Sequence, residues 1–134
     1  MSTIRHSVLI IGIKFNAPIP DHFRDVFGPA EGLAAKLEAD SARAAKAGFN
    51  CHLHQLDPVQ PEEALRELEA KLKTGSYCGV MWGGGLRLLP EKTALFEAII
   101  NLFRELVSNV PFMFNTGPDT ICDALERNFG VKIE

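Results

Sequence analysis

The sequence contains none of the short motifs that identify the common nucleotide-binding and hydrolytic sites. Its 134 residues hold no G-x-G-x-x-G after a strand, no G-x-x-x-x-G-K-[ST] and no G-x-S-x-G. These motifs build the phosphate loops of dinucleotide-binding and P-loop proteins and the nucleophile elbow of α/β-hydrolases. Their absence argues against these three classes, so a site has to be sought in less specific patterns.

The chain also lacks a basic run and a long apolar run. Its 14 basic and 17 acidic residues give a net charge of −3, and the lysines and arginines are scattered. Such a chain has no general attraction for nucleic-acid phosphates, so we expect no nucleic-acid partner. No stretch reaches the roughly 18 to 20 apolar residues of a bilayer span, and the first residues lack a cleavage signature. We expect neither a membrane span nor a secretory leader.

Cysteine is scarce and unpatterned, with Cys51, Cys78 and Cys122 far apart and no C-x-x-C pair. This set predicts no disulfide framework and no structural zinc site, and it fits buried thiols in a reducing, cytoplasmic location. His52 and His54 share one face of a predicted strand, a spacing compatible with metal ligation, but no third ligand is evident. Solvent-facing histidines on an edge strand explain the same pair, and we predict no metal site.

What the sequence does contain is a regular alternation of strand-like and helix-like segments. With 46% hydrophobic and 23% charged residues, the composition predicts one globular domain over residues 1–134. Period and boundary residues define the segments. The predicted strands are 7–13, 49–56, 77–82 and 110–114, with a short fifth at 131–133; the predicted helices are 30–47, 61–73, 91–107 and 120–128, with a helical turn at 21–27.

Strands that alternate with helices pair in parallel through right-handed crossovers. The first and third strands are apolar on both faces, which suits central positions, whereas the second alternates and suits an edge. We therefore predict an α/β fold, a three-layer doubly wound parallel sheet of four or five strands in the order 2-1-3-4(-5). This order and the chain length are similar to those of flavodoxin-like proteins, over the whole chain but without a shared functional motif.

The segments after two strands differ from those of known flavodoxin-like classes. Residues 14–18 lack the hydroxyl-rich and glycine-rich phosphate loop of flavodoxins, which argues against FMN binding. The third strand ends in Met81-Trp82, without the aspartate of response-regulator receiver domains, which argues against phosphoacceptor signalling. The topology therefore locates a site without naming its ligand.

In open parallel sheets the ligand crevice lies outside the carboxyl ends of the strands, where neighbouring connections leave on opposite faces. For the order 2-1-3-4, this point lies between strands 1 and 3. The stretch MWGGGLR, residues 81–87, follows strand 3 there. Glycines without Cβ atoms let backbone N–H groups approach a ligand and adopt positive φ in an anion-binding nest, and Arg87 and Lys14 add positive charge. The alternative is a plain strand-to-helix turn, with Arg87 paired to a surface carboxylate.

Two further segments meet the same edge. Asn115, Thr116 and Asp119 follow the fourth strand and form a third wall, although Thr116 and Asp119 also resemble a helix-capping box. The predicted ligand-binding residues are Lys14, Asn16, Gly83, Gly84, Gly85, Arg87, Asn115, Thr116 and Asp119. The long connection at 15–29 is interpreted as a lid or as a packed decorative loop; as a lid it covers the crevice with Phe23 and Phe27 and reaches the ligand with His22, Arg24 or Asp25.

The helix at 91–107 carries more apolar surface than one sheet face needs. Its surplus stripe consists of Phe96, Ile100, Phe103 and Val107. Exposed aromatic and branched residues mark interfaces, so this stripe predicts a homodimer, unless neighbouring helices bury it.

Together these patterns predict a cytoplasmic domain that binds a small anionic or nucleotide-like ligand at the carboxyl ends of strands 1, 3 and 4. Catalysis and cofactor stay unassigned, because no general base is evident among the predicted residues. The alternative function is a non-catalytic oligomeric scaffold or regulatory module that acts through its third helix. A flavin or nicotinamide oxidoreductase rests on analogy of fold alone.

Overall fold

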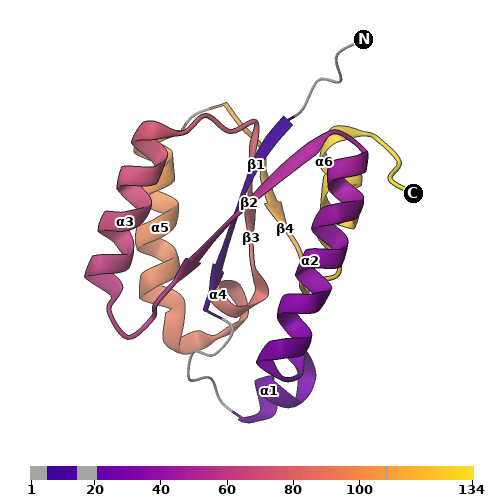
Figure 1. Ribbon diagram of the computed structural model, residues 1–134. Coiled ribbons are helices and arrows are strands. Elements are labelled where there is room, and N and C mark those ends of the chain that lie inside the picture. The colour runs from indigo at the N-terminus through magenta and orange to yellow at the C-terminus, as the bar shows by residue number, and fades with distance from the viewer. Residues whose placement is uncertain (1–5, 15–20, 108) are drawn as a thin grey trace.

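Four parallel strands form the sheet that organises the chain. The computed structural model describes residues 6–14, 21–107 and 109–134. The strands are β1 (His6–Ile13), β2 (Phe49–Leu56), β3 (Gly79–Trp82) and β4 (Phe112–Phe114). They pair in the order β2-β1-β3-β4, which confirms the predicted flavodoxin-like α/β architecture (Figure 1). As the alternation of β2 indicated, this strand lies at an edge.

Helices cover both faces of the sheet in two separate layers. The principal helices are α2 (Ala30–Lys46), α3 (Pro61–Thr74), α5 (Thr93–Leu106) and α6 (Ile121–Phe129), and the short elements are α1 (Asp21–Phe27), α4 (Gly84–Leu88) and η1 (Pro90–Lys92). In Figure 1, α2 and α6 lie on one side of the sheet and α3 and α5 on the other. Successive residues of β1 point to opposite faces, so Val8 and Ile10 join the core under α2 and α6, and Leu9 and Ile11 join the core under α3 and α5.

Glycine residues follow the ends of two of the helices. Gly48, two residues after α2, has a φ of 96°, and its N–H donates to the Ala45 carbonyl at 3.1 Å. Gly130, directly after α6, has a φ of 65° and donates to the Glu126 carbonyl at 3.1 Å. Both residues adopt the left-handed conformation that costs glycine little, and both return the chain toward the sheet.

A buried carboxylate joins the two helices on one face. Asp40, in α2, is only 4% exposed. Its Oδ2 accepts the backbone N–H of Cys122 in the first turn of α6 at 2.9 Å, and its Oδ1 accepts Nη1 of Arg43 at 2.8 Å. The carboxylate therefore satisfies an N–H at the positive end of α6, although it comes from another helix.

Several predicted elements differ from those observed, and β3 and β4 each begin two residues later than predicted. Residues 131–134 form no strand, so the optional fifth strand is absent from the described part of the chain. The segment after β3, expected as an open loop, forms the short helix α4. The predicted helix at 91–107 begins instead with the 3₁₀ turn η1 and becomes regular at Thr93.

The apolar surplus of α5 is largely used inside the molecule. Phe103 is fully buried, and Phe96, Ile100 and Val107 are partly buried against the core that α5 shares with α3. Leu106 remains 37% exposed near the end of the helix. Within the described ranges, no helix combines the length and apolar character that crossing a membrane requires.

Candidate functional site

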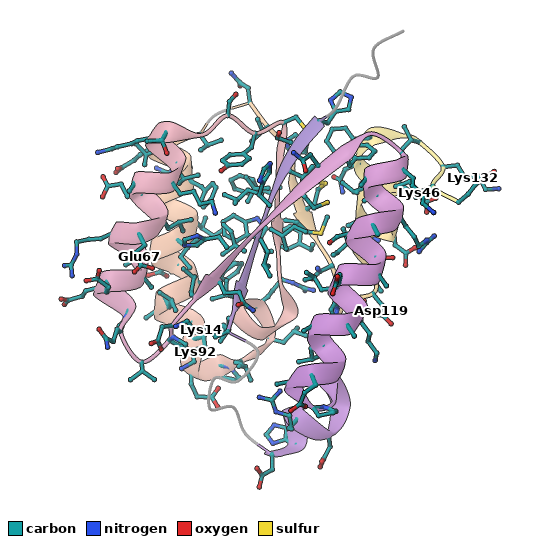
Figure 2. All side chains as sticks on the ribbon, viewed as in Figure 1. Lys14, Lys46, Glu67, Lys92, Asp119 and Lys132 are labelled. Carbon is teal, nitrogen blue, oxygen red and sulfur yellow. The ribbon has the colours of Figure 1, made fainter. Side chains whose placement is uncertain are left out.

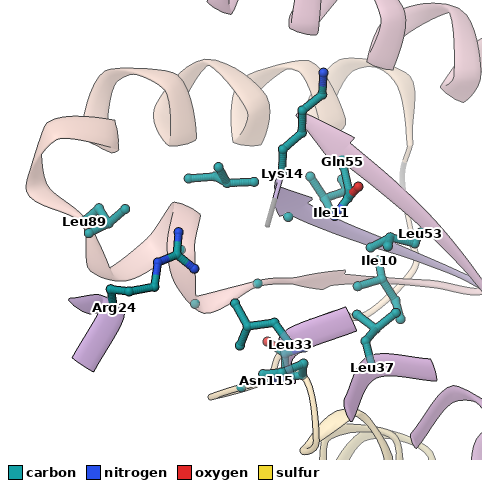
Figure 3. A pocket seen from close by; sticks show the side chains of 17 residues that line it. Ile10, Ile11, Lys14, Arg24, Leu33, Leu37, Leu53, Gln55, Leu89 and Asn115 are labelled. Carbon is teal, nitrogen blue, oxygen red and sulfur yellow. The ribbon is translucent and has the colours of Figure 1, made fainter. Parts of the chain in front are cut away.

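A pocket opens at the carboxyl edge of the sheet, on the face covered by α2. Its interior has a volume of about 100 Å³. The floor comes from the ends of β1 and β2, one wall from Leu33 and Leu37 of α2, and the end from the segments that follow β3 and β4 (Figure 3). The pocket thus includes the point between β1 and β3 where the strand order predicts a ligand.

The strand register explains why there is space at this point. Gly12 of β1 pairs with Gln55 of β2, while Ile11 pairs with Trp82 and Trp82 with Phe114. One residue beyond that last row, the sheet presents Gln55, Gly12, Gly83 and Asn115 across its four strands, all lining the pocket. We call this set the edge row. Side chains alternate along strands, so the edge row faces the same side as the buried Ile10, Met81 and Met113.

The two central members of the edge row leave the floor of the pocket bare. A Cβ atom on Gly12 would meet nothing within 4 Å, so glycine is not required here by packing. A Cβ atom on Gly83 would lie 3.2 Å from the Ile11 carbonyl oxygen and 3.4 Å from the Gly12 Cα, so close packing against β1 favours glycine at this position. The space beside Gly12 is therefore open to a ligand, whereas the β1 backbone occupies the space beside Gly83.

The two outer members of the edge row are amides with unused hydrogen-bonding atoms. Asn115 is 4% exposed, and its buried Oδ1 has no hydrogen-bond partner among the described residues. The same holds for the buried Nε2 of Gln55 within the described part of the chain. Figure 3 shows both amides among the apolar side chains of the pocket. A buried polar atom that lacks a partner costs about 1–3 kcal/mol, and a bound ligand can supply the missing hydrogen bond.

Two cationic residues, Arg24 and Lys14, belong to the lining of the pocket. Arg24 of α1 enters on the side of Leu89, and its Nη1 donates to the Gly28 carbonyl at 3.3 Å (Figure 3). Lys14 follows β1, and its Nζ lies 3.9 Å from Asp57 Oδ2 in a largely exposed ion pair. Among the described residues that line the pocket, none carries a carboxylate. The local charge therefore favours an anionic ligand.

The glycine segment after β3 differs from the nest expected of it. Gly83, Gly84 and Gly85 all line the pocket, but positive φ occurs at other glycines and not at these three. The N–H of Gly83 donates to the Ile11 carbonyl at 2.8 Å, and Gly84 already begins α4. The prediction of a positive-φ nest was therefore wrong, and these glycines instead give a helix close access to β1.

Arg87 holds the end of β4 in place. Its Nη2 donates to the backbone carbonyl of Asn115 at 2.9 Å, and its guanidinium lies 5.4 Å from the ring centre of Phe114. Arg87 thus pairs with a main-chain carbonyl instead of the surface carboxylate considered above. Arg127 of α6 donates to the Phe114 carbonyl at 2.7 Å. Two arginines from different helices therefore fix the backbone that carries the Asn115 side chain.

The turn after Asn115 is built around Thr120. The Thr120 hydroxyl oxygen accepts the backbone N–H groups of Thr116 and Gly117 at 2.9 and 3.1 Å, and the hydroxyl donates to the Gly117 carbonyl at 3.0 Å. The residue that organises this turn is thus Thr120, rather than the predicted capping pair of Thr116 and Asp119. Thr116 and Asp119 are exposed and do not line the pocket.

The structure brings together part of the predicted site. Lys14, Gly83, Gly84, Gly85 and Asn115 line one pocket, whereas Arg87, Thr116 and Asp119 lie outside its lining. Asn16 and the side chains of Phe23 and Phe27 fall outside the described residues. The pocket lining also includes residues that the sequence analysis did not predict: Gly12, Gln55, Leu33, Leu37 and Leu53. Gly12 carried a signal, because a glycine inside a buried strand marks close approach of another group.

The two strand histidines are more buried than an exposed edge predicts. His52 and His54 are both half-buried, and His52 packs edge-on against Tyr77 at 5.9 Å. Burial lowers the pKa of His54, and the nearby Lys71 lowers it further. No group of three potential metal ligands occurs within residues 6–14, 21–107 and 109–134.

Comparison with protein-family models, curated proteins and solved structures finds no match for this chain. The site therefore has to be interpreted from its own geometry.

Proposed function

We propose that this protein binds a small anionic or nucleotide-like molecule in the pocket at the carboxyl edge of the sheet. The apolar walls of the pocket would contact the uncharged part of that molecule. The pocket itself is the main support. It has an interior volume of about 100 Å³, apolar side chains along its walls, and Lys14 and Arg24 in its lining. Small-molecule sites are typically lined by apolar side chains together with a few polar or charged groups.

The described lining favours binding over catalysis. Apart from the Lys14 amine, its side chains offer no group that commonly serves as a general base or nucleophile. They offer amides, a guanidinium and aliphatic carbon, which hold a ligand and orient it. Catalysis therefore stays unassigned.

A thermal-shift titration tests the proposal. The purified protein is screened against inorganic phosphate, AMP, UMP, an acyl-CoA and octanoate, because a ligand that binds the folded state raises its melting temperature. Gly12→Leu should abolish the shift, since its side chain would enter the open floor of the pocket. Gly32→Leu is the matched control, because Gly32 lies in α2 outside the pocket lining. If no compound shifts the melting temperature at millimolar concentration, the proposal is wrong.

A second experiment tests the expected negative charge of the ligand by neutralising the two cationic residues of the pocket lining. Arg24→Gln and Lys14→Gln should each weaken the binding of an anionic ligand about threefold to tenfold, and added salt should reduce the difference. Lys46→Gln is the control, because Figure 2 places Lys46 at the opposite end of the molecule from Lys14. Equal affinities in all three variants would contradict an anionic ligand.

Two further assignments remain proposals. The three cysteines are free, which supports a reducing cytoplasmic location. A homodimer through the Phe96, Ile100, Phe103 and Val107 stripe is less supported than the pocket, since these side chains pack within the molecule. Light scattering coupled to size-exclusion chromatography tests it directly.

A further inference from the structure

We propose that the buried part of the ligand is a flat heterocycle that lies on the Gly12–Gly83 floor and is recognised at its edges by Gln55 and Asn115. This inference rests on the proposed function and adds the chemical class of the ligand. It follows from the order of residues in the edge row: amide, glycine, glycine, amide.

The width of the edge row suits a ring system. Neighbouring strands lie roughly 4.8 Å apart, so β2 and β4 are separated by three spacings, or about 14 Å. The amides occupy both ends of this span, and the two glycines leave its centre without side chains. A chain-like apolar ligand needs only a narrow channel, whereas a flat ring needs a broad, smooth floor such as this one.

The walls above the floor are also suited to a flat ligand. Ile10 and Leu53 lie next to the edge row on the same sheet face, and Leu33 and Leu37 face them from α2 (Figure 3). These aliphatic groups contact both faces of an inserted ring without directing it. The orientation of the ring must be set by hydrogen bonds, and the Gln55 and Asn115 amides provide the polar atoms for them.

The unused amide atoms define what the ring must carry. Oδ1 of Asn115 needs a donor, and Nε2 of Gln55 needs an acceptor. Nucleobases and related lactam heterocycles present both kinds of group on their edges. Simple aromatic or alkyl groups present neither, and binding them would leave both amides without partners.

Asn115 is held ready for this role by groups outside the pocket. Arg87 binds its backbone carbonyl at 2.9 Å, and Arg127 binds the preceding carbonyl at 2.7 Å. With its backbone fixed, the amide loses little freedom when it meets a ligand. We therefore assign Arg87 as a positioning residue.

The experiment measures dissociation constants by calorimetry for four probes that share a phosphate. AMP and UMP carry heterocycles with polar edges, whereas phenyl phosphate and hexyl phosphate carry apolar groups of different shape. We expect AMP or UMP to bind at least tenfold more tightly than both apolar phosphates. Asn115→Leu should remove most of this advantage and leave the affinity for phenyl phosphate within about twofold of the wild type.

A second readout separates recognition from structural support. Replacing a buried amide that lacks a partner by an aliphatic side chain should raise the melting temperature of the unliganded protein, even though it weakens nucleotide binding. If Asn115→Leu fails to fold, Gln55→Met and the ligand N3-methyl-UMP, which lacks the N3–H donor, provide the same comparison. The methylated nucleotide should bind about tenfold more weakly than UMP.

The outcomes distinguish the two proposals. If all four probes bind with similar affinity and Gly12→Leu abolishes their binding, the proposed ligand pocket is supported and the proposed recognition of a heterocycle is overturned. Nucleotide preference that survives both Asn115→Leu and Gln55→Met would also overturn it. Absence of binding by every probe would overturn both proposals.

Discussion

Removal of the Asp40 carboxylate should destabilise the fold more than most single substitutions do. Asp40→Ala leaves the buried Cys122 N–H without its acceptor and removes the partner of Arg43. A hydrogen bond to a charged group contributes about 1.5–3 kcal/mol to stability, and a partly exposed ion pair adds about 0.2–1 kcal/mol. The expected loss is therefore about 2–4 kcal/mol in the free energy of unfolding.

Urea denaturation followed by tryptophan fluorescence provides the measurement. The sequence has one tryptophan, Trp82, and it is fully buried, so its emission reports global unfolding. The midpoint should fall in Asp40→Ala while the slope with denaturant stays constant, because the same surface is exposed on unfolding.

Two control variants divide the effect between the two partners of Asp40. Asp40→Asn keeps an acceptor for the Cys122 N–H but loses the charge, and should cost about 1 kcal/mol. Arg43→Met removes the ion pair alone and should cost no more than about 1 kcal/mol, since the Arg43 side chain is 48% exposed. A loss below about 0.5 kcal/mol in Asp40→Ala, or an equal loss in Arg43→Met, would refute the capping role.

Three further outcomes are expected. Gly83→Ala should cost about 1–3 kcal/mol in a urea titration, since its Cβ atom would lie 3.2 Å from the Ile11 carbonyl oxygen, whereas Gly12→Ala should be neutral or slightly stabilising. Burial lowers the pKa of His54 from 6.5, so the unfolded state binds its proton more readily, and stability should fall as the pH drops below 6.5. His54→Gln should flatten this dependence in a urea titration repeated across this pH range. Burial raises the pKa of Cys51 to about 12 and that of Cys122 to about 11, so iodoacetamide at pH 8 should label them about 100-fold more slowly in the native protein than in urea, and fast native labelling would contradict their burial.

The fold was predictable because its signals are local and repeated. Buried runs such as 7–13 and the alternation of 49–56 indicated which strands are central and which lies at the edge, and the observed order agrees. Gly48 and Gly130 marked helix ends because the left-handed conformation at those ends favours glycine. The short helix α4 was missed, since three consecutive glycines disfavour a helix and its contacts with β1, α5 and η1 are tertiary.

The candidate site was predictable in position and less so in composition. Strand order alone placed Lys14, the glycines after β3 and Asn115 at one edge of the sheet. Arg87 was expected to face a ligand, but a charged side chain on a short helix has several directions open to it, and its contacts with Asn115 and Phe114 depend on tertiary packing. Sequence reasoning gave Gln55 no role, although the alternation of 49–56 puts it on the same face as Cys51 and Leu53.

The edge row shows which further step from the sequence was within reach. The buried residues Ile10, Met81 and Met113 share one face of the sheet, and the positions two residues further along the same strands are Gly12, Gly83 and Asn115. On all three strands the apolar pattern therefore stops at the same row of the sheet, where two glycines and an amide replace side chains that would otherwise have packed against α2. Close packing against β1 explains Gly83, whereas packing does not explain Gly12, and a departure from local preference of this kind is expected at a functional site. What the sequence lacks is the register between strands, which aligns these positions and which the packing of whole helices on the sheet determines.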